Sequence, residues 1–285
     1  MNSALHIACI QLNSRGDVEE NLRGATRLAA SATADGAKFI AFPEVTDFMA
    51  QSANGYRAYA PSERNHLALA ELRALAERLG VWTLIGSLTV CVEEDEPKRI
   101  ANRSYLIRPD GEIAARYDKI HLFDVKLPNG QEFRESDIYV GGRDAVLAQT
   151  PWGGIGLSIC YDLRFPHLYR RLAQGGAAIM FAPAAFTATT GALHWQTLLR
   201  ARAIENGCFV VAPAQCGGHG ENRRCYGHSV IVDPWGKVLV EGGDEPGVFA
   251  ASLDLAEVDR FRAAIPSPLK EQPFGLISSP ALEQT

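Results

Sequence analysis

Short apolar runs alternate with amphipathic stretches along the whole chain. Residues 5–12 alternate like a half-buried strand, and a helix is expected to open at Asp17 and to stop near Gly36. Residues 38–42 predict a short buried strand, and Ser62 is expected to begin a second amphipathic helix that ends at Gly80. The first third of the chain therefore predicts alternating strands and helices.

Three pairs of strand-like runs flank turn sequences further along. The turns are Arg-Pro-Asp-Gly111, Pro-Trp-Gly-Gly154 and Asp-Pro-Trp-Gly236, and their prolines suggest an internal duplication. Strands at 177–181 and 208–212 with a helix over 192–206 lie between the hairpins, and 248–254 predicts a last strand. This mixture fits neither a purely parallel barrel nor an all-β sandwich. We expect an α/β fold in which two mixed sheets pack face to face with helices outside.

The expected domain organisation is one domain over residues 1–265 followed by a C-terminal tail over 266–285, which is rich in proline and serine and either wraps a partner or is loose. Residues 93–98 form a charged surface excursion. Residues 125–142 are polar, contain several glycines and show no period. A loop of that length inside a domain is usually functional.

Composition narrows the classes of function. The 285 residues are 47% hydrophobic and 21% charged, with a formal net charge of −5, and the longest basic cluster is Arg223-Arg224. We therefore expect no nucleic-acid partner and no association with an anionic membrane. No apolar window approaches the ~18 residues of a membrane span, and the N-terminus lacks the basic region of a signal peptide.

The six cysteines include no Cys-x-x-Cys pair, which predicts a reduced, cytoplasmic protein without a disulfide framework. His194, His219 and His228 lack metal-ligand spacing. We expect neither a metal nor another cofactor.

Residues 156–166 carry the most informative chemistry. An apolar run ends on Cys160, and polar residues and the helix-opening Pro166 follow. A cysteine on such a strand-to-helix elbow suits a nucleophile, because the following N–H groups and the next helix can stabilise a thiolate and an oxyanion. A buried core cysteine would give the same pattern, so this segment alone leaves both interpretations open.

Three further polar residues precede Cys160 in characteristic contexts. Glu44 ends Phe-Pro-Glu at the carboxyl end of a buried strand, Lys119 lies in Tyr-Asp-Lys-Ile-His-Leu-Phe123, and Glu135 opens Glu-Ser-Asp137. Each alone has an ordinary interpretation as a surface residue. Together with 156–166, in this order, they resemble the Glu-Lys-Cys motifs of the nitrilase (carbon-nitrogen hydrolase) superfamily, over essentially the whole chain.

The resemblance implies a four-layer α-β-β-α sandwich and an amide hydrolase of class EC 3.5.1. Cys160 would attack the amide carbon, Glu44 would act as the base, and Lys119 would stabilise the oxyanion. Glu135 would orient the lysine and the substrate amide. The resemblance assigns His121, close to Lys119, a packing role. It also implies a homodimer or a larger homo-oligomer.

Ala-Ala-Phe186 looks like the Nit-type amidases. Three further motifs look most like the branch that hydrolyses deaminated glutathione, an amide of a 2-oxo acid, to 2-oxoglutarate and cysteinylglycine: Gln-Cys-Gly217, Tyr-Gly-His-Ser229 and Asp-Pro-Trp-Gly236. Alternatives are ω-amidase action on 2-oxoglutaramate or 2-oxosuccinamate, nitrile hydrolysis, and a non-catalytic scaffold.

A 2-oxo acid substrate carries a carboxylate, and Arg164 is the expected bidentate partner of that carboxylate, with Phe186, Thr190 and Tyr161 lining the pocket. The alternative is that Arg164 pairs with Asp162 and braces the elbow. The loop over 124–135 departs from the Pro-Gly pattern of the Nit relatives, which leaves the distal part of the substrate open.

Overall fold

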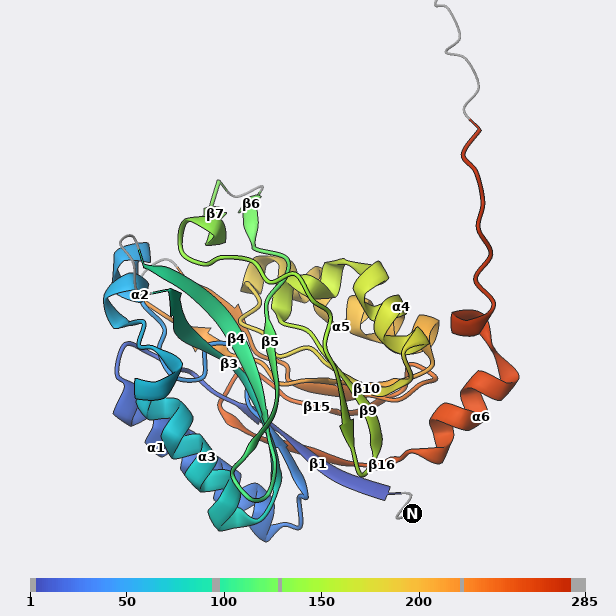
Figure 1. The fold of residues 1–285 in the computed structure, drawn as a ribbon, viewed down its shortest axis with the longest axis horizontal. Helices are drawn as coiled ribbons and strands as arrows, with labels where there is room; N and C mark the ends of the chain where they lie inside the picture. Colours follow the sequence, from blue (N-terminus) through green and yellow to red (C-terminus); the bar gives the residue numbers. More distant parts are fainter. Residues whose placement is uncertain (1–3, 94–97, 128–129, 221–222, 278–285) are drawn as a thin grey trace, which may run out of the picture.

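Two six-stranded sheets lie face to face in the computed structural model, which describes residues 4–93, 98–127, 130–220 and 223–277 (Figure 1). In spatial order, the first sheet contains β16 (Gly247–Asp254), β1 (Ala4–Gln11), β2 (Phe39–Ala41), β3 (Trp82–Glu93), β4 (Arg99–Ile107) and β5 (Ile113–Asp118). The second sheet contains β15 (Val238–Glu241), β14 (Val230–Val232), β11 (Phe209–Ala212), β10 (Ala177–Phe181), β9 (Gly153–Leu157) and β8 (Leu147–Thr150).

Both sheets have the same internal arrangement. Three central strands run parallel, β1, β2 and β3 in the first sheet and β9, β10 and β11 in the second. An antiparallel hairpin follows on one side (β4–β5 or β14–β15), and one antiparallel strand (β16 or β8) closes the other side. The duplication suggested by the turn prolines therefore corresponds to a repeated strand order.

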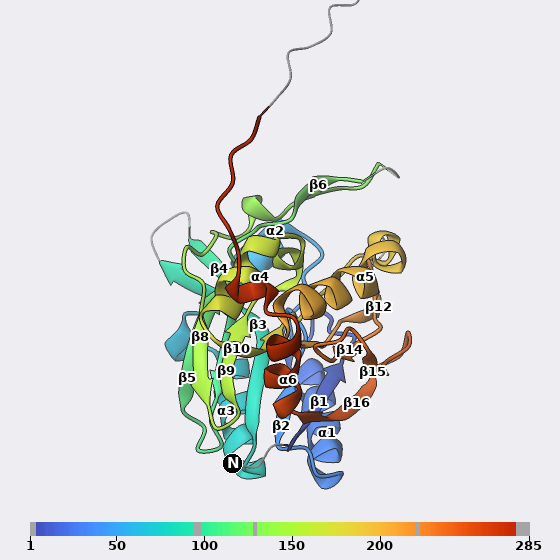
Figure 2. The ribbon, with the colours of Figure 1, turned by 90° about the vertical axis from the view of Figure 1, so that its right-hand side faces the viewer.

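Helices cover the outer faces. α1 (Val18–Ala34) and α3 (Leu67–Leu79) pack on the first sheet, and α4 (Pro166–Gln174) and α5 (Ala188–Asn206) pack on the second (Figures 1 and 2). The side chain of Asp17 caps α1 by accepting from the Glu20 N–H at 2.9 Å. These layers confirm the predicted α-β-β-α sandwich.

One part of the core lies between the two sheets, and a second part lies between the first sheet and the helices α1 and α3. Phe39 of β2 and Phe181 of β10 are fully buried, and their rings stack across the interface with centroids 5.1 Å apart. Burying one such side chain contributes about 1.5–3 kcal/mol. The tight packing fixes the distance between the carboxyl ends of the two sets of parallel strands.

The second predicted helix begins later than expected, at Leu67 rather than at Ser62. Ser62 forms a β-bridge with Cys91, which holds its backbone extended, and its side chain makes no capping hydrogen bond. The short helix α2 (Ala53–Tyr59) and a 3-10 turn (Glu63–Asn65) precede α3 instead. Side-chain spacing cannot reveal such a tertiary bridge.

The segment expected as a featureless loop contains a small hairpin, β6 (Asp124–Lys126) with β7 (Glu132–Arg134), followed by a 3-10 turn (Glu135–Asp137). The hairpin projects from the sandwich (Figure 2). A second small hairpin, β12 (Cys216–Gly218) with β13 (Arg224–Tyr226), was not predicted. Residues 128–129 of this loop and 94–97 of the predicted charged excursion lie outside the described residues.

The C-terminal part begins with α6 (Ala256–Ala264), and residues 270–277 then run in extended form away from the sandwich (Figures 1 and 2). Phe274, Leu276 and Ile277 are almost fully exposed there. The rest of the predicted tail, 278–285, lies outside the described residues. Across the described ranges, every helix is too short or too polar to traverse a bilayer.

Candidate active site

The predicted catalytic side chains meet where the strands of the two sheets end. Glu44 follows β2, Lys119 follows β5, and Cys160 follows β9. β2 pairs in parallel with β3, and the antiparallel pairs β3–β4 and β4–β5 reverse the direction twice, so β5 runs parallel to β2. Both strands therefore end at the same edge of the sheet. This edge is where open α/β sheets form ligand sites.

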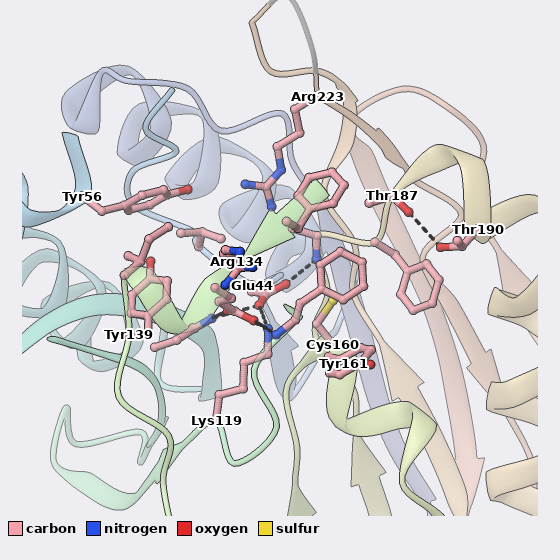
Figure 3. A pocket seen from close by; sticks show the side chains of 18 residues that line it. Glu44, Tyr56, Lys119, Arg134, Tyr139, Cys160, Tyr161, Thr187, Thr190 and Arg223 are labelled. Carbon is pink, nitrogen blue, oxygen red and sulfur yellow. Dashed lines mark hydrogen bonds and ion pairs between the residues drawn. The ribbon is translucent and has the colours of Figure 1, made fainter. Parts of the chain in front are cut away.

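Lys119 lies between two carboxylates. Its Nζ is 2.8 Å from Glu44 Oε1 and 2.8 Å from each oxygen of Glu135 (Figure 3). The exposed fractions of the three side chains are 2% for Lys119, 4% for Glu44 and 13% for Glu135. An ion triplet so well shielded from water is held in place by short charge-assisted hydrogen bonds.

Neutral donors complete the carboxylate shell. The Ala185 N–H donates to Glu44 Oε2 at 2.7 Å, and the Phe123 N–H donates to Glu135 Oε2 at 2.6 Å. Asn102 Nδ2 donates to Glu44 Oε1 at 2.9 Å and to Glu135 Oε1 at 3.3 Å. Asn102 thereby links both carboxylates from β4, a role that the sequence patterns did not predict.

The electrostatics define the resting protonation state. Burial acts to raise the pKa of Glu44, but the adjacent Lys119 cation outweighs it and leaves that pKa below its usual range. Burial acts to lower the pKa of Lys119, while the Glu135 and Glu44 carboxylates raise it. Burial and the Glu44 charge hold the pKa of Cys160 well above its usual value. The site therefore holds a carboxylate, an ammonium and a neutral thiol.

Backbone strain coincides with two of these positions. Cys160 has φ 48° and Val45, directly after Glu44, has φ 52°, a region that β-branched residues rarely adopt. Hydrogen bonds stabilise both turns: the Cys160 N–H donates to Pro183 O at 2.9 Å, and the Val45 N–H donates to Ser87 Oγ at 2.9 Å. Strained residues of this kind cluster at functional sites.

The predicted elbow contains a 3-10 turn, Cys160–Arg164, and α4 starts at Pro166, as the sequence predicts. The helix next to Cys160 is therefore this short turn rather than α4. The buried Asp162 organises the turn by accepting from the Ile159 N–H at 2.9 Å and from Tyr117 Oη at 2.6 Å.

Asp162 also joins the turn to the segment that carries Lys119. Its Oδ1 lies 3.0 Å from the donating His121 N and 2.7 Å from His121 Nδ1. The His121 ring stacks on Phe165 with centroids 3.5 Å apart. These contacts agree with a packing role for His121, as the sequence indicated.

A pocket with an empty volume of about 720 Å³, which includes its open mouth, contains the triplet and Cys160. The lining comprises the four predicted catalytic residues, the predicted Tyr161, Phe186 and Thr190, and further side chains: Val45, Tyr56, Asn102, Phe123, Phe133, Arg134, Ile138, Tyr139, Ala185, Thr187 and Arg223.

Arg164 is absent from this lining, contrary to the sequence expectation. Its guanidinium lies over the outer side of the Phe186 ring, 5.1 Å from the centroid, and its Nη1 is 3.2 Å from His194 Nδ1 on α5. The 3-10 turn directs the side chain toward α5. The carboxylate of Asp162 has the donors named above, so the alternative Arg164–Asp162 brace is not formed either.

Arg223 is the cation that sequence reasoning overlooked. In the sequence it is half of the basic dipeptide Arg223-Arg224, and in the structure its guanidinium points into the pocket (Figure 3). Nothing in its local sequence indicates that direction, because it precedes the unpredicted strand β13. Among the described residues, no cluster of three or more His, Cys, Asp or Glu side chains has the arrangement of a metal site.

Comparisons with known proteins agree with this geometry. The carbon-nitrogen hydrolase family model matches residues 6–263. A deaminated glutathione amidase of Synechocystis sp. is 41% identical over 265 residues, which are 91% of this chain and 95% of that protein. The NitFhit protein of C. elegans has a TM-score of 0.88 at 36% identity, covering 94% of this chain and 65% of that longer protein.

Nit3 of Saccharomyces cerevisiae, a member of branch 10 of the nitrilase superfamily, has a TM-score of 0.84 at 29% identity and covers 94% of this chain and 96% of that one. The family model, the similar folds and the site motifs thus all indicate the same family, and the matches cover nearly the whole sequence. The chain belongs to the carbon-nitrogen hydrolase family of the nitrilase superfamily and is a hydrolase of carbon–nitrogen bonds other than peptide bonds.

Proposed function

We propose that this hydrolase cleaves deaminated glutathione to 2-oxoglutarate and cysteinylglycine through a thioester on Cys160. The observation that carries the proposal is the buried Glu44–Lys119–Glu135 triplet beside the Cys160 thiol. The relatives named deaminated glutathione amidase, which include the Synechocystis protein, support the choice of substrate.

In the first half-reaction, Glu44 takes the thiol proton while Sγ bonds to the amide carbon. The carbonyl π electrons move to oxygen, and Lys119 and the Tyr161 backbone N–H stabilise the resulting oxyanion. The oxyanion then reforms the carbonyl, the C–N bond breaks, and Glu44 gives its proton to the leaving nitrogen. The products of this half-reaction are an acyl-thioester and a free amine.

In the second half-reaction, Glu44 removes a proton from water as the water oxygen attacks the thioester carbon. The C–S bond breaks, and the sulfur regains a proton from Glu44. Glu135 keeps Lys119 oriented throughout, since both of its oxygens hold Nζ. Each cycle consumes one amide and one water and releases one acid and one amine.

This resting state explains how a thiol with a raised pKa can serve as nucleophile. A carboxylate beside the thiol is ready to accept its proton during the attack, so the thiolate need not be present beforehand. The positive charge of Lys119 favours the ionised Glu44 before attack and the oxyanion after it.

A side-by-side assay tests the proposal. Purified protein is given deaminated glutathione, 2-oxoglutaramate and a simple nitrile, and the same three assays are run on Cys160→Ala. We expect the highest kcat/KM on deaminated glutathione and a loss of at least about 1,000-fold in the variant. Higher kcat/KM on 2-oxoglutaramate would favour the ω-amidase alternative. Undiminished activity of Cys160→Ala would rule out the mechanism.

We place this reaction in the cytoplasm as part of the proposal. Six free thiols, one of them the proposed nucleophile, suit a reducing compartment. Fractionation of the source cells, with the activity followed in the membrane-free extract, tests the assignment.

A further inference from the structure

The catalytic pocket continues outward into two shallower hollows, and Arg223 lines all three spaces. The first hollow lies against the start of α5, and the second lies between α2 and the β6–β7 hairpin. Arg223 is therefore at the junction of the enclosed reaction site and the mouth. Figure 3 shows its guanidinium reaching down between Tyr56 and Cys160.

The guanidinium has hydrogen-bonding capacity to spare. Within the described residues, its Nε is buried and has no hydrogen-bond partner. Leaving a buried donor of a charged group unpaired costs more than losing an ordinary hydrogen bond, so such a group calls for a partner such as water or a ligand. An anion in the pocket would satisfy it.

The other cations of the pocket are occupied. Lys119 is held by Glu44 and Glu135, and Arg134 pairs with Glu132 with its side chain 66% exposed. Arg164 does not line the pocket, and its guanidinium lies against the Phe186 ring. Of the described cations that line the pocket, Arg223 is thus the one placed to receive a negative charge from the substrate.

The chemistry of the reaction decides which end of the substrate faces Arg223. The acyl group stays bonded to Cys160 after the C–N bond breaks, whereas the amine must leave before water enters. The leaving amine therefore occupies the side of the pocket that opens to solvent. Arg223 lies on that side, because it also lines both outer hollows.

We propose that Arg223 binds the carboxylate of the departing peptide, the glycine carboxylate of cysteinylglycine, and so selects amides with an anionic leaving group over simple ω-amides. The inference rests on the proposed function and names the part of the substrate that the loop sequence left open. A planar guanidinium suits a bidentate contact with a carboxylate.

The test pairs a protein change with a substrate change. Wild-type protein and Arg223→Gln are each assayed on deaminated glutathione and on the same compound with its glycine carboxylate converted to a carboxamide. We expect the carboxamide to lower wild-type kcat/KM about 10- to 100-fold, the size of a lost charged hydrogen bond. Arg223→Gln should lower kcat/KM on deaminated glutathione by a similar factor. Its kcat/KM values on deaminated glutathione and on the carboxamide should therefore be nearly equal.

Arg78→Gln, which removes an exposed arginine of α3 that lines none of the three spaces, is the charge-matched control and should keep the wild-type preference. Arg223→Lys should recover part of the preference, because it restores the charge without the planar fork. Circular dichroism checks that each variant is folded.

Equal discrimination by wild type and Arg223→Gln would overturn the assignment, as would a wild-type protein indifferent to the carboxamide. The comparison of the acid with the carboxamide on wild-type protein needs no variant, so it remains decisive even if Arg223→Gln does not fold. A wild-type protein that hydrolyses other amides but not deaminated glutathione would overturn the proposed function and this inference together. Activity on deaminated glutathione without discrimination would overturn the inference alone.

Discussion

Lys119 shows that the charge state of a site residue depends on its surroundings in the fold, which its local sequence does not reveal. An ammonium with 2% exposure is stable only because two carboxylates and their own donors surround it. Each of Glu44, Lys119 and Glu135 alone has the ordinary interpretation of a surface side chain. Burying any one of these charges alone would be unfavourable, but together they form one preorganised arrangement of paired charges.

The pH dependence of kcat/KM follows from Glu44. Its pKa lies below the usual 4.5, and the reactive form of the free enzyme needs this carboxylate ionised. We predict that kcat/KM rises with pH only below about pH 4.5 and stays level through neutral pH. A pH profile of kcat/KM with an acid limb centred near pH 6 would contradict the assigned base.

Asn102→Ala removes a donor from Glu44 Oε1. Because a hydrogen bond to the charged form lowers a carboxyl pKa, its loss raises the pKa of Glu44 and moves the acid limb to higher pH. We expect kcat/KM at neutral pH to fall about 10-fold, corresponding to a lost charge-assisted hydrogen bond of about 1.5 kcal/mol.

Asn206→Ala is the control for this prediction, because Asn206 is equally buried but donates to Arg202 O away from the pocket. It should lower the melting temperature and leave the acid limb in place. An unmoved acid limb in Asn102→Ala would show that Asn102 does not act on Glu44.

The site residues differed in how far sequence could predict them. Glu44, Lys119, Glu135 and Cys160 have distinctive flanking motifs, and the structure brings all four together. Arg164 was chosen for its nearness to Cys160 in sequence, but the 3-10 turn points it to the far side of Phe186. Distance along a chain does not determine the direction of a side chain.

At the scale of elements, close backbone contacts position the loops that carry the catalytic groups. Gly142 donates its N–H to Lys119 O at 2.9 Å, and a Cβ at this position would come within 2.3 Å of Asp118 O. A side chain there must displace the strand end that supports Lys119.

Gly142→Ala should therefore lower kcat/KM about 100-fold, since a shift of about 1 Å in a reacting group has an effect of that size. Gly24→Ala is the matched control: Gly24 lies in α1 with open space around its Cβ position, so the change should stabilise the helix by about 0.5–1 kcal/mol without loss of activity. Comparable kcat/KM values for the two variants would show that the contact with Asp118 is unimportant.

Elements with strong local signals were predicted well, and those set by distant contacts were not. The turn prolines and alternating side chains indicated the three main hairpins, which the structure confirms. The start of α3 and the small β6–β7 and β12–β13 hairpins depend on pairing with remote or very short segments. Periodicity carries no information about such partners.

At the scale of the whole molecule, the repeated sheet arrangement explains where the site lies. Each sheet has three central parallel strands, and the carboxyl ends of both sets meet at one edge of the sandwich. The first sheet supplies Glu44 and Lys119, the proposed base and cation, and the second supplies Cys160, the proposed nucleophile. Neither sheet alone supplies Glu44, Lys119 and Cys160 together. The proposed reaction therefore depends on the packing between the two sheets.

We expect the protein to assemble into a homodimer or a larger oligomer. Leu193 of α5 is 73% exposed, and Phe274 in the extended C-terminal segment is 94% exposed, so both side chains are available to pack against a second copy of the chain. Light scattering should give at least twice the mass of one chain. Deletion of residues 266–285 should shift the equilibrium toward smaller species. A monomer at micromolar concentration would contradict this expectation.

The central claim is that Cys160 carries the acyl group of the substrate during turnover. The most direct measurement is mass spectrometry of the peptide containing Cys160 after acid quenching of wild-type protein that is hydrolysing deaminated glutathione. We predict a 2-oxoglutaryl thioester on Cys160 that hydroxylamine removes and that Cys160→Ala lacks. Rapid turnover with no acyl group on Cys160, or with the acyl group on another residue, would contradict it.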